Sequence, residues 1–201
     1  RQTGLLTDLP QCRQGIAAVG PSRDGHALRE DESAAPISYY GESKLAAEDE
    51  VRRFQHYFPT TILRPAAVYG PRDSETLRLI KLVSSGIRIR IGAGDNHFSA
   101  VHVLDAAEAI RLSAEDTQRG GNRTYFVGDG SIYSWEETFS ILTELLGKNR
   151  IWLTIPGGIL RGTVRLLARI FPGSSPAFYL DKIRELSQNY WVCDTGRIRA
   201  D

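Results

Sequence analysis

Apolar residues fall along the chain in two kinds of pattern. Short apolar or β-branched runs are typical of buried strands, whereas stretches with an apolar residue at every third or fourth position are typical of helices. The runs predict strands at residues 60–63, 98–103, 124–127 and 151–155. The stretches predict helices at residues 41–57, 74–85, 134–147, 159–171 and 178–186, and one more at Asp105.

The ends of several predicted helices are marked by residue type. Pro59 is expected to stop the first helix, and Asp105 is expected to be the N-cap of its own helix. Ser134 and Glu137 have the spacing of a capping box, in which each side chain binds the other residue's backbone N–H. Residues 15–19 are expected to be a short strand end. The apolar positions of the first helix form one stripe, made of Ala47, Val51, Phe54 and Phe58.

The order of these elements predicts the fold class. Strands that alternate with helices favour an α/β fold with a largely parallel sheet, and residues 60–63, 98–103 and 124–127 are expected to share one sheet system. From residue 149 onward the pattern is mainly helical, which indicates a smaller lobe. The 201 residues, of which 41% are hydrophobic, suffice for one domain with a sizeable core.

Charge, cysteine content and hydropathy narrow the function classes. A net charge of +1 gives no overall field that attracts nucleic acid, so no nucleic-acid partner is expected. No stretch has the roughly 18 apolar residues of a membrane-spanning helix, and the start of the chain lacks the apolar core of a secretory signal. Two cysteines without metal-ligand spacing fit a reducing compartment, so we expect a cytoplasmic protein without a metal site. The chain has no methionine and is interpreted as an excerpt.

The sharpest chemical feature is the sequence Tyr40-Gly-Glu-Ser-Lys44 at the start of the first helix. Residues four apart lie on one helix face, so the lysine ammonium is expected near the tyrosine hydroxyl. A free tyrosine has a pKa of about 10, and work near neutrality requires a pKa lower by roughly 3, or about 4 kcal/mol. A cation in a cleft that excludes water supplies most of that, which makes Tyr40 a candidate general acid/base. Taken alone, the pair also fits an exposed helix start with an amphipathic tyrosine.

Further motifs follow in a fixed order. They are Gly20-Pro-Ser22, Glu30-Asp31, Tyr40-Gly-x-Ser-Lys-Leu-Ala-Ala-Glu48, Leu63-Arg-Pro-x-x-Val-Tyr-Gly-Pro-Arg72, Phe98-x-x-Val-His-Val-x-Asp105 and Tyr125-Phe-Val-Gly-Asp129. In this order and spacing, the chain from about residue 15 onward resembles the extended short-chain dehydrogenases/reductases, the NAD-dependent epimerase/dehydratase family. The resemblance implies a partial Rossmann-type parallel sheet with a small, mainly helical C-terminal lobe. Its parts would be an atypical segment at residues 1–14, the partial Rossmann-type domain with interleaved substrate-lobe segments at 15–148, and the substrate lobe at 149–201.

The resemblance also implies site residues and a cofactor, NAD or NADP. Tyr40 would be the catalytic acid/base, and Lys44 would hold the nicotinamide ribose hydroxyls and lower the tyrosine pKa. With them, the segment after a strand end would line the nicotinamide pocket, as ligands bind beyond the carboxyl ends of parallel strands; its residues are Pro65, Ala66 and Val68. Substrate contacts are assigned more loosely, to Arg72, Asn96, His97 and Phe98. We interpret His102 as a hydrogen-bonded packing residue.

The chain departs from the family pattern in two respects. The glycine-rich turn that approaches the cofactor pyrophosphate is not in this sequence. The position 25 residues before Tyr40, where the family places a catalytic Ser or Thr, is Gly15. Truncation, a slip of reading frame and a degenerate pseudoenzyme all explain this pattern, and the sequence leaves the three open. As it stands, the chain is expected not to bind NAD or NADP measurably.

Two function hypotheses follow. The first is an NAD(P)-dependent oxidoreductase, epimerase or dehydratase acting on a small hydroxyl or carbonyl substrate, such as a sugar nucleotide or a sterol- or flavanol-like molecule. The alternative is a catalytically inactive fragment or pseudoenzyme without the cofactor-phosphate site.

A homodimer through the helix that carries Tyr40 and Lys44 is a further expectation. Residues 159–171 also form an amphipathic helix candidate for a membrane surface, although an ordinary lobe helix is the favoured interpretation.

Overall fold

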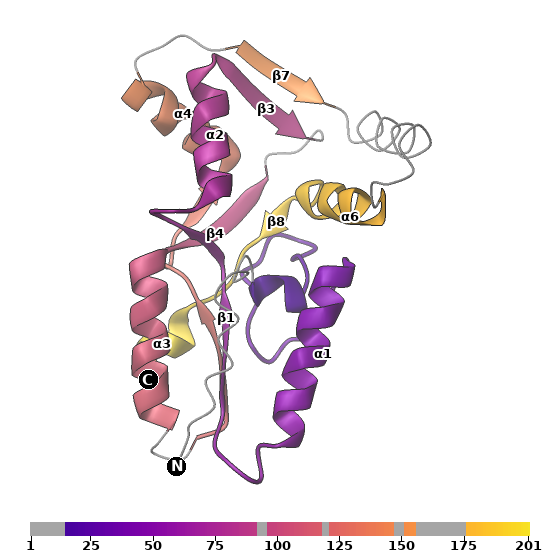
Figure 1. The fold of residues 1–201 in the computed structure, drawn as a ribbon, viewed down its shortest axis with the longest axis vertical. Helices are drawn as coiled ribbons and strands as arrows, with labels where there is room; N and C mark the ends of the chain where they lie inside the picture. Colours follow the sequence, from indigo (N-terminus) through magenta and orange to yellow (C-terminus); the bar gives the residue numbers. More distant parts are fainter. Residues whose placement is uncertain (1–14, 92–95, 118–120, 147–150, 156–175) are drawn as a thin grey trace.

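The computed structural model describes residues 15–91, 96–117, 121–146, 151–155 and 176–201. Helices and strands alternate along the chain, and parallel pairings dominate the sheets (Figure 1), which confirms the α/β class. The helical elements are η1 (Gly15–Ala18, a 3-10 helix), α1 (Tyr39–Arg53), α2 (Ser74–Ser84), α3 (Val103–Thr117), α4 (Trp135–Leu146), α6 (Pro176–Leu186) and α7 (Gly196–Ala200). The strands are β1 (Thr61–Pro65), β2 (Ala67–Tyr69), β3 (Ile87–Ile91), β4 (His97–His102), β5 (Arg123–Val127), β6 (Ile132–Ser134), β7 (Ile151–Ile155) and β8 (Tyr190–Trp191).

One continuous stretch of chain changes its partner strand at Ala66. Before it, β1 pairs in parallel with β5, and the N–H of Ala66 extends this ladder to the carbonyl of Val127 at 2.9 Å. After it, β2 pairs in parallel with β4, whose other neighbours are β6 and β8. The three strands predicted for one sheet system therefore lie in two adjoining sheets that are linked through Ala66. A further parallel pair, β3 with β7, lies beside α2 and α4 (Figure 1).

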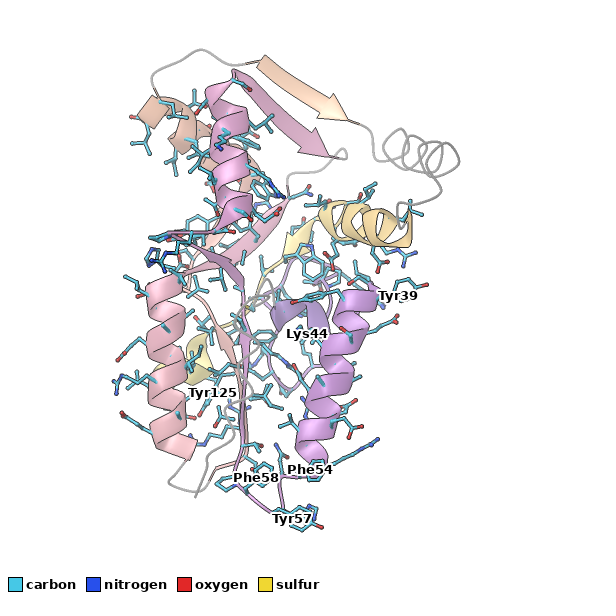
Figure 2. All side chains as sticks on the ribbon, in the orientation of Figure 1. Tyr39, Lys44, Phe54, Tyr57, Phe58 and Tyr125 are labelled. Carbon is cyan, nitrogen blue, oxygen red and sulfur yellow. The ribbon has the colours of Figure 1, made fainter. Side chains whose placement is uncertain are left out.

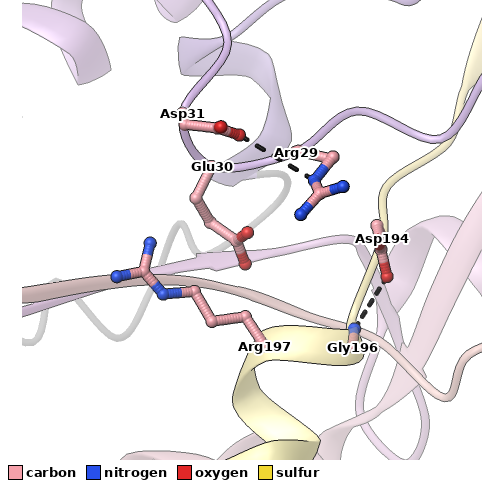
Figure 3. A pocket seen from close by; sticks show the side chains of 6 residues that line it. All are labelled: Arg29, Glu30, Asp31, Asp194, Gly196 and Arg197. Atoms are coloured by element: carbon pink, nitrogen blue, oxygen red, sulfur yellow. Dashed lines mark hydrogen bonds and ion pairs between the residues drawn. The ribbon is translucent and has the colours of Figure 1, made fainter.

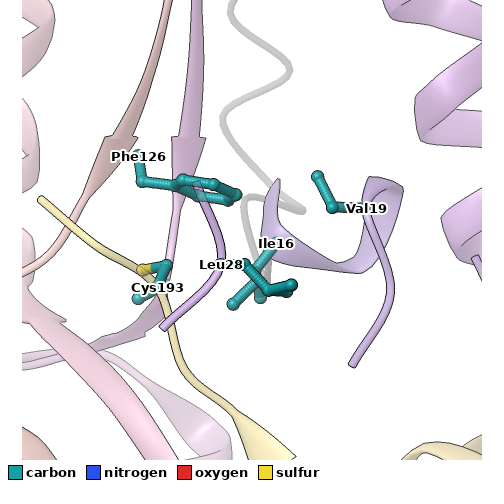
Figure 4. Packing of buried hydrophobic residues seen from close by; sticks show 6 residues of the cluster. Ile16, Val19, Leu28, Phe126 and Cys193 are labelled. Carbon is teal, nitrogen blue, oxygen red and sulfur yellow. The ribbon is translucent and has the colours of Figure 1, made fainter. Parts of the chain in front are cut away.

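The buried core brings together segments that are distant in sequence. Its residues are Ile16, Val19, Leu28, Ala66, Phe126 and Cys193 (Figure 4). Phe126 and Ala66 are completely buried, and Trp191 packs against the cluster. The parallel bridge between Leu28 and Cys193 ties the long loop after η1 to the end of the chain. The core thus joins η1, that loop, the β1–β5 sheet and the segment after β8.

Helix α1 lies on the opposite side of the β1–β5 sheet from α3 (Figure 1). It begins at Tyr39, two residues earlier than the sequence suggested, and ends at Arg53, before Pro59. The predicted apolar stripe is not buried: Phe54 and Phe58 lie beyond the last turn with 48% and 54% of their surface exposed, and Ala47 is also exposed. The helix is held to the fold by Gly41 and by Glu48 instead, as described below.

Other local predictions differ in outcome. The capping box is confirmed, because the N–H of Ser134 donates to Glu137 at 3.0 Å and the N–H of Glu137 donates to the Ser134 hydroxyl at 3.1 Å. The strand end expected at residues 15–19 is wrong, since η1 is a 3-10 helix. Asp105 is not an N-cap, because α3 already begins at Val103. The helix expected at residues 159–171 lies outside the described residues, and β2, β3, β6 and β8 were not expected.

Candidate active site

The first turn of α1 presents the two residues that the sequence singled out. Ser38 has the extended backbone of an N-cap (φ −135°, ψ 155°), and its hydroxyl accepts the N–H of Gly41 at 3.0 Å. This bond satisfies one of the N–H groups that a helix start leaves without an internal partner. Tyr40 therefore lies in a turn with a defined beginning, two residues after the cap.

Tyr40 and Lys44 lie one helical turn apart, and both are half-buried. The ammonium of Lys44 lies over the Tyr40 ring, 5.5 Å from the ring centre. This distance is within the range of an attractive cation–π contact. Figure 2 places Lys44 on the side of α1 that faces the β1–β5 sheet. The structure therefore brings the Lys44 ammonium to the ring of Tyr40, one helical turn away. Its approach to the hydroxyl stays a prediction.

The turn η1 connects this helix start to the end of β1. A Cβ added at Gly41 would lie 2.4 Å from the carbonyl oxygen of Ala17, so α1 approaches η1 as closely as backbone allows. A Cβ added at Gly15 would lie 2.5 Å from Cδ of Pro65. Both contacts are far shorter than ordinary packing distances, so only glycine fits at these two positions. The start of α1 and the Pro65 end of β1 are thus packed on opposite ends of the same short turn.

The residues after Pro65 continue along the strand. Ala66 is fully buried at the change of partner strand, and Val68 stands in register with Val101 of β4 and is half-buried. The segment that the family resemblance places at a nicotinamide pocket is thus a junction between two strands, with Ala66 buried in it. The packing on η1 places it near the helix that carries Tyr40 and Lys44.

A buried ion pair fixes the middle of α1 against β1. Arg64 donates from Nε and Nη2 to the two carboxylate oxygens of Glu48, at 3.0 and 2.8 Å. The two side chains are 4% and 11% exposed, and the guanidinium also lies over the ring of Phe126, 5.6 Å from its centre. Sequence analysis did not foresee this pair. The signal in the sequence was the position of the two charges inside the motifs, since Glu48 follows Lys44 by one helical turn and Arg64 directly precedes Pro65.

The loosely assigned substrate residues are held by other elements. The buried Asn96 side chain donates to the carbonyls of Leu186 and Gln188, at 3.2 and 3.0 Å. The ring of His97 stacks on that of Tyr190 with 5.7 Å between centres. Phe98 packs against the aromatic rings of Tyr133 and Trp135. Arg72 is exposed and has a left-handed backbone (φ 74°).

His102 and two further tyrosines have structural partners. The ring of His102 accepts a long 3.4 Å hydrogen bond from the N–H of Leu104 and meets the Tyr69 ring edge-on. Burial, with a hydrogen bond to Asp201, raises the pKa of Tyr125, and a hydrogen bond to Asp129 raises the pKa of Tyr133. A raised pKa keeps the phenol protonated, which is opposite to what a tyrosine general base near neutrality needs. These shifts argue against Tyr125 and Tyr133 as general bases.

A cavity of about 400 Å³ lies elsewhere in the structure (Figure 3). Its lining is charged and consists of Arg29, Glu30, Asp31, Asp194, Gly196 and Arg197. One carboxylate oxygen of Glu30 accepts the N–H of Phe126 at 2.8 Å, and Asp194 accepts the N–H of Gly196 at 2.8 Å. Neither Tyr40 nor Lys44 contributes to the lining, so this cavity is not the predicted site.

In the part of the chain that the structure describes, no helix is long and apolar enough to cross a membrane. In the same residues, no group of three or more His, Cys, Asp or Glu side chains is placed to hold a metal ion.

Comparison with protein families gives a match that spans the candidate site. Residues 17–128 match the description "NAD dependent epimerase/dehydratase family", which is more than half of the chain. The matched region contains Tyr40, Lys44 and the segment that follows Pro65. It begins two residues after Gly15.

Similar proteins include both lipid- and sugar-related enzymes. The chain is 28% identical to a ceramide reductase of Caulobacter vibrioides over 168 residues, which are 78% of this chain and 49% of that protein. It is 33% identical to a bovine sterol-4-alpha-carboxylate 3-dehydrogenase, decarboxylating, over 119 residues, 55% of this chain and 33% of that protein. The solved structure of MoeE5 in complex with UDP-glucuronic acid and NAD is 29% identical, with a TM-score of 0.61, covering 70% of this chain and 49% of that chain. The chain thus spans between a third and a half of these proteins.

Proposed function

Because the chain belongs to the NAD dependent epimerase/dehydratase family, we propose that it carries the proton-transfer part of an NAD- or NADP-dependent active site. The reaction class is oxidation, reduction, epimerisation or dehydration at a hydroxyl or carbonyl group of a small molecule. The observation that carries the proposal is the position of the Lys44 ammonium, 5.5 Å from the centre of the Tyr40 ring, in the first turns of α1.

The two side chains have different roles in this proposal. The Tyr40 hydroxyl exchanges a proton with the substrate oxygen, which is general acid/base catalysis. The Lys44 ammonium stabilises the phenolate, and its N–H donors suit the ribose hydroxyls of a nicotinamide cofactor. The bound nicotinamide would accept or supply a hydride. The strand junction at Pro65 and Ala66 supplies a rigid, water-excluding wall.

The substrate class is drawn from the relatives. The names of two of them specify a ceramide and a sterol carboxylate, and a solved relative holds a sugar nucleotide. We propose a small molecule with a secondary hydroxyl or carbonyl group, of the sugar-nucleotide or of the sterol- or lipid-like kind. A panel with both kinds and both cofactors separates these cases. Oxidation or reduction changes the absorbance of the nicotinamide, whereas epimerisation and dehydration return it to its starting state and are detected by analysis of the product.

The test is a set of single substitutions, made in the full-length parent that the family resemblance implies and measured for turnover and for cofactor affinity. Tyr40→Phe removes one hydroxyl, so kcat should fall by about 10² to 10⁴ while cofactor affinity stays the same. Lys44→Met should weaken cofactor binding about 10- to 100-fold, the value of a lost charge-assisted hydrogen bond, and lower kcat as well. Tyr133→Phe and Lys81→Met are the matched controls, because they remove a hydroxyl and an ammonium outside the site. Small, equal effects in all variants would refute the proposed roles.

A second candidate is a family member that binds ligands without turnover. The observation that favours it is Gly15, which stands where the family resemblance implies a catalytic Ser or Thr. Absence of turnover with the full panel, together with measurable cofactor affinity that Lys44→Met abolishes, would support this candidate. Turnover that depends on the Tyr40 hydroxyl would exclude it.

We also propose that a second copy of the chain packs on α1. Large hydrophobic side chains are exposed at both ends of this helix (Figure 2), namely Tyr39, Phe54, Tyr57 and Phe58. Phe54, Tyr57 and Phe58 form an aromatic cluster, with 6.2 and 6.4 Å between the ring centre of Phe54 and those of the other two, and exposed apolar clusters are typical of interaction surfaces. Sedimentation velocity should detect a dimer that Phe54→Ser dissociates. A monomer at all concentrations would contradict the proposal.

A further inference from the structure

Three polar side chains of helix α6 form hydrogen bonds to the residues at the start of α1. The hydroxyl of Ser38 donates to Oε1 of Glu185 at 2.6 Å. The N–H of Tyr39 donates to Oδ2 of Asp181 at 2.7 Å, and Nη1 of Arg184 donates to the carbonyl of Ile37 at 3.1 Å. These three side chains have the i, i+3 and i+4 spacing of one helix face. They therefore bind three consecutive residues, 37 to 39, that directly precede Tyr40.

The bond between Ser38 and Glu185 sets the orientation of the N-cap. A hydroxyl has one proton to donate and lone pairs to accept with. Ser38 gives its proton to Glu185 and accepts the N–H of Gly41 at 3.0 Å, so its rotation is fixed from both sides. Ser38 and Glu185 are only 2% and 6% exposed, so water does not replace either bond. Carboxylates at a helix N-terminus also interact favourably with its dipole.

Helix α6 is itself held in place at its other end. Asn96, which directly precedes β4, donates from its side chain to the carbonyls of Leu186 and Gln188. The indole N–H of Trp191 donates to the carbonyl of Glu185 at 3.0 Å, and Ile183 is buried. Because α6 is fixed to β4 and β8, Asp181 and Glu185 transmit the position of those strands to the first turn of α1.

We infer that Glu185 and Asp181 are positioning residues of the active site, which act through Ser38 and the N–H of Tyr39 to set where the Tyr40 hydroxyl lies. The inference rests on the proposed role of Tyr40. Tyr40 follows these two anchor residues directly, so a shift of the turn moves its hydroxyl. A displacement of about 1 Å at a reacting group can lower a rate about 10²-fold.

A purely structural cap is the competing explanation, and the chain offers a matched control for it. Asp73 is the N-cap of α2 and accepts the N–H groups of Glu75 and Thr76 at 3.0 Å each. Asp73→Ala therefore removes a cap from a helix without the candidate acid/base. Ser38→Ala and Asp73→Ala should lower the melting temperature to a similar degree. Only Ser38→Ala should also change the position of the Tyr40 hydroxyl and, with it, the turnover rate.

The kinetic experiment compares Ser38→Ala, Glu185→Ala, Glu185→Gln and Asp73→Ala in the protein with its cofactor and substrate. We expect kcat to fall about 10- to 100-fold in the first two, with KM values within about twofold, because positioning and not binding is lost. Glu185→Gln should recover most of the activity, since its amide oxygen accepts the same proton. Wild-type kcat in Ser38→Ala and Glu185→Ala, or an equal loss in Asp73→Ala, overturns the inference.

A spectroscopic experiment separates this inference from the proposed function. In protein labelled with ¹³C at tyrosine Cζ, the resonance lost in Tyr40→Phe reports the surroundings of that hydroxyl without any turnover. It should shift in Ser38→Ala and Glu185→Ala and stay unchanged in Asp73→Ala. Wild-type turnover of Tyr40→Phe would refute the proposed function alone, whereas an unmoved Tyr40 resonance in both Ser38→Ala and Glu185→Ala refutes the positioning inference.

Discussion

Arg64 and Glu48 form a bidentate ion pair between β1 and α1, with donor–acceptor distances of 3.0 and 2.8 Å and side chains that are 4% and 11% exposed. The pair is asymmetric in its surroundings. Glu48 has a second partner, because Arg52 donates to it at 2.7 Å. For Arg64, the other acceptor within hydrogen-bond reach among the described residues is the carbonyl of Glu30, at 3.5 Å. Loss of the carboxylate therefore leaves a buried cation poorly compensated.

We predict that Glu48→Met destabilises the protein more than Arg64→Met does. Removing one partner of a buried pair costs about 3–5 kcal/mol when the other charge is left alone, and less when a neighbour such as Arg52 still neutralises it. The double variant should recover part of the loss. Arg78→Met, which breaks an exposed pair with Glu75, should change the unfolding free energy by less than about 1 kcal/mol. Urea unfolding of the four variants measures this, and equal losses at both buried positions would contradict the asymmetry.

A second prediction concerns Gly15. Its missing Cβ would lie 2.5 Å from Cδ of Pro65 and 2.6 Å from Cα of Arg64, so a side chain there must displace backbone. Gly15→Ser should destabilise the protein by about 1–3 kcal/mol, as overpacking does. Gly121→Ala is the control, because the atoms nearest to an added Cβ there belong to the side chain of Arg123 and not to backbone. A stable Gly15→Ser variant with increased turnover would mean instead that position 15 has lost a catalytic hydroxyl.

What the sequence predicted well depends on local interactions. Ser134 and Glu137 are three residues apart, and their reciprocal bonds follow from spacing alone. The contact between the Lys44 ammonium and the Tyr40 ring likewise follows from their separation by one helical turn. Segments whose conformation is set by distant partners were missed. The turn η1 is packed between two distant segments, since its Ala17 contacts Gly41 of α1 and its Gly15 contacts Pro65 of β1. Strand β2 likewise depends on its pairing with β4.

The same reasoning explains the positioning residues that the sequence did not reveal. Glu185 and Ser38 are 147 positions apart, and no spacing rule connects an acidic residue of one helix to the cap of another. Asn96, which the family resemblance placed among substrate contacts, binds the end of α6 for a similarly non-local reason. Motifs indicated candidate residues for the chemistry, whereas the contacts that orient them required the fold.

A third prediction concerns pH and the loop after η1. His26 is hydrogen-bonded through one ring nitrogen to Asp24 and through the other to Glu32, the latter at 2.9 Å. The bond to Asp24, followed by that to Glu32, raises the pKa of His26 above its usual 6.5. The bond to His26 lowers the pKa of Asp24 from 3.8 to about 2. Both shifts favour the charged forms in the folded protein.

The sign of the effect on stability follows from these shifts. A raised histidine pKa contributes stability that is complete below pH 6.5 and is lost as the pH rises through the folded value. The Asp24 contribution is complete above pH 3.8 and is lost as the pH falls toward 2. His26→Gln should therefore lower the unfolding free energy most between these limits and least at alkaline pH. A stability difference that grows from neutral to alkaline pH would show that the bonds do not stabilise charged His26.

The last prediction uses Cys193 as a reporter of the core. Its thiol is 5% exposed beside Phe126 and Leu28, and burial raises its pKa from 9.0 to about 12. Only the thiolate reacts with alkylating reagents, so this shift alone lowers the reactive fraction about a thousandfold, and burial blocks access as well. In a Cys12→Ser background, which leaves one thiol, Cys193 should react only when the core opens. Phe126→Ala leaves a large cavity in that core and should cost about 3–5 kcal/mol. It should therefore speed alkylation by orders of magnitude, whereas Tyr57→Ala, at an exposed position, should not. Rapid alkylation of Cys193 in the otherwise unchanged protein would mean that η1, β5 and the segment after β8 do not enclose the thiol.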